Sequence, residues 1–316
     1  MGPRARLATL LHLVAMALAP IAWSCKGSTA PAPPVEAPRP KPCNAHLIAL
    51  QMVQGKLGTM VYVDRLRGRP AAEKLTRAGY FRDLFDGTGL DPMRDFDRVF
   101  VASTGITRDD RAVVIAQHKL TPDRLRSAVD VLVARSDPPG AWLDGMGLPA
   151  ARVTIHGHTR VIGIVDDDYV AVVPEPLAGQ ARLWLGTGGF PDPQSSAAIV
   201  SVARDPSKTL RAPRLPRIPQ TVSSMRIELR CSEDGSMDAS ADAESASEQQ
   251  AEKDAATMTE EVARTTSVRV SIFRVHLFKP VAFRSEGRHV KSDVHLTGEE
   301  VDKLVGMAEL LRGSMP

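Results

Sequence analysis

The chain of 316 residues has few aromatic side chains and no second long apolar run after its N-terminus. Aromatic residues make up only 4% of the chain, so leucine, valine, isoleucine and alanine must fill its core. Beyond residue 25 no stretch approaches the roughly 18 apolar residues of a membrane-spanning helix, and we expect none there. Hydrophobic residues at 43% and charged residues at 24% are typical of a globular protein.

The sequence also lacks the motifs that common catalytic sites require. It contains neither the Gly-x-Ser-x-Gly of an activated serine nor the His-Glu-x-x-His of a zinc protease. Gly186-Thr187-Gly188-Gly189 lacks the Lys-Ser/Thr of a phosphate-binding loop. The sequence therefore predicts a protein that is not an enzyme, with no catalytic residues and no cofactor.

The chain beyond residue 42 also lacks an excess of basic residues. The net charge is +3 and the pI about 8.8, but residues 1–42 hold five basic groups and one acidic group. Residues 43–316 hold 35 basic and 36 acidic residues. Because a nucleic-acid-binding protein needs excess Lys and Arg to replace phosphate counterions, we expect no nucleic-acid partner.

The N-terminus has the pattern of an export signal, predicted over residues 1–24. Arg4 and Arg6 precede an apolar stretch, Leu7 to Ala19, which is too short to cross a membrane. Ala22-Trp23-Ser24-Cys25 resembles the lipobox of bacterial lipoproteins, in which the cysteine is lipidated after cleavage. Ordinary signal peptidase is the alternative, since small residues also occupy the positions that it reads. Cys25 is the predicted lipidation site.

A proline-rich tether is predicted over residues 25–43. It begins Lys26-Gly-Ser-Thr-Ala and then carries six prolines between positions 31 and 42, which is typical of a disordered spacer behind an anchor. We therefore expect an exported cell-envelope protein that contacts the membrane through an N-terminal lipid. Lys26, directly after the cysteine, resembles the outer-membrane sorting pattern. We therefore expect an outer-membrane protein whose body faces the periplasm or the cell surface. Without lipidation, the protein would be periplasmic or secreted.

Three cysteines in an exported chain leave one thiol unpaired in any disulfide scheme. If Cys25 carries the lipid, Cys43 and Cys231 remain in an oxidising compartment. One hypothesis is a disulfide between these two residues, which would fix the end of the tether to the C-terminal half. Two unrelated thiols are an equally good interpretation.

The exported body has the pattern of an α+β protein, with antiparallel sheets covered by helices and two subdomains of similar size. The first is predicted over residues 44–190 and the second over residues 220–316. Six prolines mark a connector at residues 191–219, with possible structure only at its centre. Thr121, Ser247 and Thr297 are each placed to cap a helix. Residues 266–280 fit either a strand or a helix.

Charge alternates along the second half of the chain. Residues 204–230 carry seven basic and two acidic groups, residues 232–262 one basic and ten acidic, and residues 264–291 seven basic and one acidic. This pattern favours compensation within the molecule. The alternative is a docking surface on the acidic helix, with Glu252, Asp254 and Glu260 among its charges.

The most metal-like cluster is His156, His158 and Asp166. Alternate residues of a strand share a face, so two imidazoles and a turn carboxylate could approach one ion. Gly157 indicates a turn between the histidines, and no third ligand is fixed by spacing. We therefore predict no metal site and keep these residues as weak candidates. His289 and His295 share a strand face with Lys291 and Asp293, which indicates a solvated polar face.

Two stretches resemble uncharacterised predicted lipoproteins of myxobacterial type. They are VDRLRGRPAAEKL with FRDLFDGTGLDPMRDFDRVFVAS, and EGRHVKSDVHLTGEEVDKLVGMAELL near the C-terminus. The resemblance implies export and assigns no activity. We thus expect a lipid-anchored envelope protein that is a non-enzymatic binding or structural module, with its protein or small-molecule partner unknown. The alternative is a secreted or periplasmic hydrolase whose site assembles from distant residues.

Overall fold

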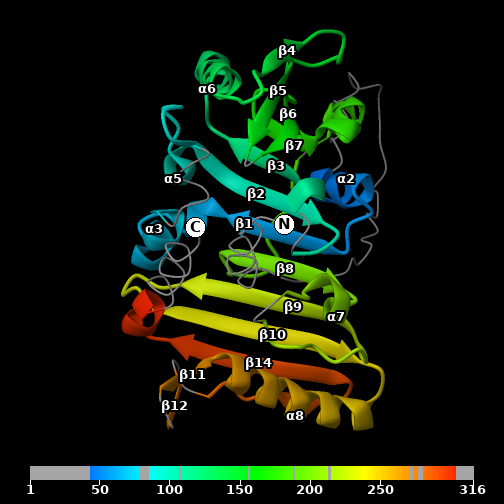
Figure 1. The fold of residues 1–316 in the computed structure, drawn as a ribbon, viewed down its shortest axis with the longest axis vertical. Coiled ribbons are helices and arrows are strands. Elements are labelled where there is room, and N and C mark those ends of the chain that lie inside the picture. Colours follow the sequence, from blue (N-terminus) through cyan, green and yellow to red (C-terminus); the bar gives the residue numbers. More distant parts are fainter. Residues whose placement is uncertain are drawn as a thin grey trace, which may run out of the picture.

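The structure is a computed structural model that describes residues 43–77, 85–106, 109–155, 157–187, 189–212, 215–270, 273–276 and 280–303. Twelve strands of these ranges form an antiparallel sheet in the order β13-β14-β10-β9-β8-β1-β2-β3-β7-β6-β5-β4 (Figure 1). A separate hairpin pairs β11 with β12. The predicted α+β class with antiparallel strands covered by helices is confirmed.

The strands of the first half are β1 (Leu57–Tyr62), β2 (Phe96–Ser103), β3 (Val113–His118), β4 (Ala141–Leu143), β5 (Ala150–Ile155), β6 (His158–Ile164) and β7 (Tyr169–Pro174). Those of the second half are β8 (Ile199–Arg204), β9 (Val222–Cys231), β10 (Met237–Ser245), β11 (Ser267–Val270), β12 (Phe273–His276), β13 (Arg284–Glu286) and β14 (His289–Leu296). The two outermost strands, β13 and β4, have three residues each, which leaves little backbone open to edge-to-edge pairing.

The α-helices are α2 (Ala45–Met52), α3 (Pro70–Arg77), α5 (Pro92–Asp95), α6 (Pro122–Ala134), α7 (Pro206–Thr209) and α8 (Glu248–Thr265). Residues 298–303 are helical as well. The 3₁₀-helices are η2 (Val63–Arg65), η3 (Asp109–Arg111) and η4 (Glu175–Trp184). Thr121 and Ser247 accept bonds from the amides of Arg124 and Gln250, and Thr297 and Glu300 bond reciprocally, so all three predicted caps are confirmed.

Helices cover both faces of the sheet in its first half. On one face, α2 and η4 bury Ala49 and Trp184 against β2, β3, β6 and β7. On the other face, α6 buries Leu125 and Val129 against β5 and its neighbours. Trp184 is fully buried, and its indole Nε1 donates to the carbonyl oxygen of Ala45 at 3.0 Å, which ties η4 to α2.

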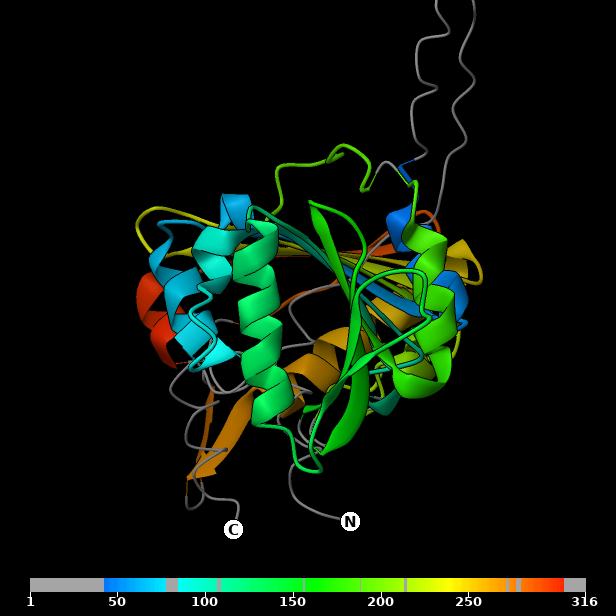
Figure 2. The ribbon, with the colours of Figure 1, turned by 90° about the horizontal axis from the view of Figure 1, so that it is seen from above.

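The second half of the sheet has a helix on one face only. Ala251, Ala255 and Met258 of α8 pack against inward-facing residues of β9, β10 and β14, on the same side of the sheet as α6. Figure 2 shows α8 on one side of these strands. Successive side chains along a strand point to opposite faces of the sheet. Every second residue of β9, β10 and β14 therefore lies on the face opposite α8.

The two halves share a single sheet. Strand β8 pairs with β1 over Ile199–Ala203 and with β9 on its other side. The hydroxyls of Thr59 and Ser201 lie 2.6 Å apart at this junction, and both residues are buried. The segment predicted as a proline-rich connector therefore contributes β8 and α7 to the fold. The region predicted as strand or helix contains strands β11 and β12.

Asp254 on α8 is a buried carboxylate, with only 2% of the residue exposed. It accepts hydrogen bonds from Thr221 (2.7 and 2.8 Å), Ser245 (2.6 Å) and Gln250 (2.9 Å). Thr221 precedes β9 and Ser245 ends β10, so this carboxylate ties the helix to two strands. The sequence pattern predicted Asp254 among the charges of a possible docking surface. That prediction is wrong for this residue, because its side chain points into the molecule.

We expect Asp254→Ala to lower the free energy of unfolding by about 2–4 kcal/mol, because Thr221, Gln250 and the buried Ser245 lose their shared acceptor. Chemical denaturation monitored by circular dichroism measures this loss. The matched control is Glu252→Ala, an exposed position on the same helix, which should change stability by less than about 0.5 kcal/mol. Equal losses in the two variants would show that the Asp254 network does not stabilise the fold.

Candidate functional site

The side of the sheet opposite α8 forms a polar surface, which we call the open face. Its residues are Ser224, Arg226, Glu228 and Arg230 on β9, Asp238, Ser240, Asp242 and Glu244 on β10, His289, Lys291, Asp293 and His295 on β14, and Arg284 and Glu286 on β13. None of the described helices packs over these residues. Except for Glu228, all of them are partly or well exposed.

Two Asp–His pairs bridge β10 and β14 on the open face. His295 Nδ1 lies 2.8 Å from Asp238 Oδ1, and His289 Nδ1 lies 2.7 Å from Asp242 Oδ1. Asp238 and His295 are direct cross-strand neighbours in the sheet register, whereas His289 lies opposite Glu244 and reaches Asp242 diagonally. The register therefore places each imidazole within reach of its carboxylate, because directly opposed and diagonal side chains on one face of an antiparallel pair lie close together.

A charged triplet on β9 borders these pairs. Glu228 is 7% exposed and lies between Arg226 and Arg230 along the same strand face. Arg226 Nε donates to Glu228 Oε1 at 2.8 Å, and Arg230 Nη2 donates to Oε2 at 2.8 Å. Arg230 also donates to the hydroxyl of Ser196 at 3.1 Å. Both guanidinium groups are thus held in place before any partner arrives.

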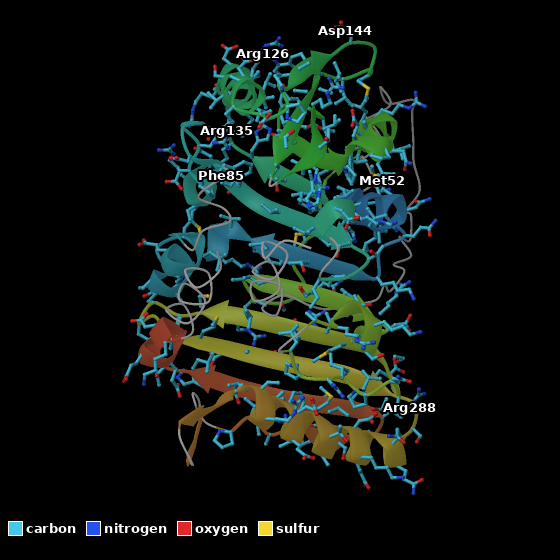
Figure 3. The ribbon with its side chains drawn as sticks, viewed as in Figure 1. Met52, Phe85, Arg126, Arg135, Asp144 and Arg288 are labelled. Atoms are coloured by element: carbon cyan, nitrogen blue, oxygen red, sulfur yellow. The ribbon has the colours of Figure 1, made fainter. Side chains whose placement is uncertain are left out.

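The edge of the open face carries a second network. Arg284 donates to Glu286 at 3.0 Å and to Asp293 at 2.9 Å, while Lys291 donates to Glu286 at 2.5 Å. At the turn between β13 and β14, Arg288 lies 3.3 Å from Glu244 (Figure 3). The Arg288–Glu244 contact pairs acidic β10 with a basic residue from later in the chain, as expected for charge compensation within the molecule.

A hollow of about 350 Å³ lies on the open face, lined by Arg230, Asp238, Ala239, Ser240, Asp293, Val294 and His295. It presents one guanidinium, two carboxylates, an imidazole and a hydroxyl. A ligand carrying both a negative and a positive group could therefore find complementary partners there. The hollow is broad and shallow, which suits a surface contact better than enclosure of a small molecule.

Asp238, His295 and Ser240 also have the residue types of a hydrolytic triad. The carboxylate orients the imidazole, as a catalytic base requires. Ser240 lies two residues from Asp238 on the same strand face. However, no hydrogen bond joins Ser240 to His295 in the described part of the chain, and both members of the Asp–His pair are about half exposed. The arrangement has an oriented base but no activated nucleophile.

A second hollow, of about 430 Å³, lies near α5 and is lined by Arg67, Gly68, Glu73, Asp91, Met93, Arg94 and Lys119. Its charges are bonded within the fold. Arg67 donates to two backbone carbonyls and to Asp97, and Lys119 pairs with the same carboxylate at 2.8 Å. We interpret this cluster as a structural junction between η2, α5 and β2.

Buried Asp95 is the centre of that junction. It accepts hydrogen bonds from the Asp91 amide (2.8 Å), Arg94 (2.9 Å) and Arg124 (3.1 Å). Burial alone would raise the pKa of Asp95, but the bonds from Arg94, from the Asp91 amide and from Arg124 outweigh it and lower the pKa. The contribution of this carboxylate to stability is therefore full above its unfolded pKa of about 4 and is lost as pH falls through the lower folded pKa.

The weak metal candidates do not form a cluster in the described part of the chain. His156 lies outside the described residues. His158 begins β6 and Asp166 follows its other end, so about 20 Å of strand separates them. More generally, no three His, Cys, Asp or Glu side chains of the described ranges are placed to hold a metal ion.

The two cysteines of the body lie on different parts of the molecule. Cys43 precedes α2, whereas Cys231 ends β9, and Figure 1 shows α2 at the right margin of the sheet and that end of β9 at the left margin. No disulfide joins them in the structure. Cys231 packs against the cluster around Leu66 and Ala71, and burial raises the pKa of its thiol.

The predicted signal, the lipidation site Cys25 and nearly all of the tether lie outside the described residues. Within the described ranges, no helix has both the length and the apolar character needed to cross a bilayer.

Sequence reasoning placed His289, Lys291, Asp293 and His295 on one polar strand face, and the structure confirms that arrangement. It missed the Arg226–Glu228–Arg230 triplet and the Asp238–His295 pair. Alternation of charged residues at every second position from 226 to 230 was the available signal for the triplet. Nothing local could indicate the pair, because its members lie 57 positions apart in the chain.

Comparison with known proteins yields no family. No protein-family model matches the chain, and no curated protein matches it. Among solved structures, crystal form I of TP0453 is similar over 83% of this chain and 98% of its own, with a TM-score of 0.45 and 9% sequence identity. The comparisons therefore assign neither a family nor a function.

From the Asp95 junction we expect stability to depend on acid pH. At pH 7, Asp95→Asn should lower the free energy of unfolding by about 1.5–3 kcal/mol, because it removes a charged acceptor from two arginines. The difference from the wild type should shrink as pH falls below about 4, because the unfolded wild-type chain is protonated at this carboxylate before the folded chain, whose pKa is lower. Urea unfolding at a series of pH values measures both effects.

The control is Asp144→Asn, an exposed position in the turn after β4 (Figure 3). This variant should follow the wild-type pH profile. A difference between Asp95→Asn and the wild type that stays constant from pH 7 to pH 3 would show that ionisation of Asp95 does not stabilise the fold.

Proposed function

We propose that this protein is an exported, lipid-anchored cell-envelope protein that works as a non-enzymatic binding module, with the open face as its binding surface. One observation carries the proposal. The open face is a rigid array of paired charged side chains left uncovered by the described helices, whereas helices cover both faces in the other half of the sheet. The open face is thus available for a partner.

The N-terminal pattern supports anchoring. A short apolar segment ends at Cys25 in a lipobox-like context, and a proline-rich stretch separates that cysteine from the folded body. A spacer of this kind lets a domain reach partners while its lipid stays in the membrane. The pattern favours the outer membrane, with the body facing the periplasm or the cell surface.

The chemistry of the open face favours a partner that carries both charges. Its fourteen residues include no Phe, Tyr or Trp and no aliphatic side chain, so an apolar ligand would find little apolar surface against which to bury itself. Arg230 can bind a carboxylate, and Asp238 and Asp293 can bind an ammonium or guanidinium group. Because ion pairs already hold these side chains, little rotamer entropy would be lost on binding. We therefore propose a polar protein or peptide segment as the partner.

Anchoring is tested by Cys25→Ser in the full-length chain. We expect the wild type to incorporate labelled palmitate and to fractionate with membranes, and the variant to do neither, because the lipid is attached to this sulfur. The matched control is Cys43→Ser, which should behave as the wild type. Lipid anchoring would be refuted if the wild type incorporated no labelled palmitate, or if the Cys25→Ser chain still fractionated with membranes.

The binding surface is tested by photo-crosslinking in the intact envelope. A photoreactive phenylalanine at Ser240 should give a discrete crosslinked product, because this residue lies in the hollow of the open face. The same group at Thr257, exposed on α8, is the matched control and should give none. The product should weaken at least about tenfold when Arg230→Glu is added, because its charge is reversed. Equal products at both positions would refute the open face as the binding site.

A secreted or periplasmic hydrolase is the second candidate, and the oriented Asp238–His295 pair beside Ser240 is the observation that favours it. It ranks second because the hydroxyl is not hydrogen-bonded to the base. Covalent modification of the wild type by a fluorophosphonate probe, absent in Ser240→Ala and in His295→Gln, would place the hydrolase first.

A further inference from the structure

Three large apolar side chains of the described residues are well exposed, and all three lie on the layer formed by α2 and η4. Leu47 of α2 is 48% exposed, Leu183 of η4 is 53% exposed, and Leu185 just after η4 is 44% exposed. Among the other residues whose side-chain burial the structure describes, large apolar side chains are buried or partly buried. The concentration of exposed leucine on one layer therefore sets this surface apart.

Hydrogen bonds hold the three leucines in one rigid frame. Trp184, which lies between Leu183 and Leu185 in the chain, donates from Nε1 to the carbonyl of Ala45 at 3.0 Å. The amide of Ala45 in turn donates to the carbonyl of Gly189 at 3.0 Å. These bonds bring the end of η4 to the first turn of α2, which carries Leu47. Leu47, Leu183 and Leu185 thus belong to two segments that are held against each other.

The loop after η4 is itself tightly constrained. Gly189 has φ of 84°, and a Cβ at this position would lie 1.8 Å from the hydroxyl of Tyr169. Only glycine fits there, since both the backbone conformation and the close approach exclude a side chain. This geometry closes the loop onto Ala45, the first residue of α2.

The same surface lies where the predicted anchor joins the body. Cys43 is two residues before α2, and residues 26–42 are the chain between it and the predicted lipid on Cys25. Seventeen residues span at most about 60 Å, so the start of α2 stays close to the membrane whenever the lipid is inserted. Tethering of this kind raises the effective concentration of the bilayer at the α2 surface.

We propose that the surface formed by Leu47, Leu183 and Leu185 lies on the lipid bilayer, with the leucines in the headgroup region of the leaflet that holds the lipid anchor. This inference rests on the proposed lipid anchoring. Exposed Arg182, next to Leu183, is placed to contact lipid phosphate while its stem follows the leucines. The surface thereby fixes which side of the body faces the membrane.

Depth-dependent quenching by lipid tests the proposal. The full-length lipidated chain is reconstituted into vesicles of phosphatidylethanolamine and phosphatidylglycerol whose acyl chains carry bromine. A Leu183→Trp reporter should lose at least about twice as much of its added fluorescence as a Thr257→Trp reporter on exposed α8, because bromine quenches only nearby indoles. The parent chain supplies the background of the native tryptophans.

The leucines themselves are tested in the Leu183→Trp chain. Adding Leu47→Ser and Leu185→Ser should reduce the quenching to the level of the Thr257→Trp reporter. The matched control adds Gln51→Ser and Gln180→Ser, two exposed polar positions on the same layer, and should leave the quenching unchanged.

The outcomes separate the two proposals. A chain that carries lipid and floats with the vesicles, but whose Leu183→Trp reporter is quenched no more than the Thr257→Trp reporter, overturns the bilayer contact and leaves anchoring intact. Quenching that persists with both serines overturns the role of the leucines. A chain that does not float with the vesicles overturns anchoring and the bilayer contact together.

Discussion

The pairing of β8 with β1 is the interaction on which the rest of this structure depends. It joins two runs of antiparallel strands into a single twelve-stranded sheet, with the buried Thr59 and Ser201 hydroxyls bonded at the junction. Without that ladder, β1 and β8 would each present an open edge in the middle of the molecule. With it, α8 at one end and α6 at the other lie on the same side of one rigid platform.

That platform explains why the protein has two surfaces of opposite character. On the side of α2 and η4, Trp184 fastens the helical layer, and three leucines remain outside it. On the uncovered part of the sheet, the register places Asp238 opposite His295 and Asp242 opposite Lys291, so charges that are segregated along the chain become neighbours. The first surface suits a membrane and the second a polar partner, and the lipid-anchored binding module that we propose would use both.

Local signals were sufficient for part of the fold. Thr121, Ser247 and Thr297 begin helices because a hydroxyl at the N-cap satisfies an amide of the first turn, which needs no distant contact. The polar face of His289, Lys291, Asp293 and His295 followed from the two-residue period of a strand. Asp254 shows the limit of such reasoning. Its helix looks acidic all round, yet this one carboxylate is buried because Thr221 and Ser245, from other elements, supply donors.

The sequence by itself determined the antiparallel α+β class, the helix starts and the balance of charge, because each depends on spacing or composition within a short window. Tertiary structure decided that β8, inside a proline-rich segment, joins both halves, and that His158 and Asp166 lie at opposite ends of one strand. It also decided which leucines stay outside the core. These outcomes depend on which strands pair and which layers cover them, and those contacts form between residues far apart in the chain.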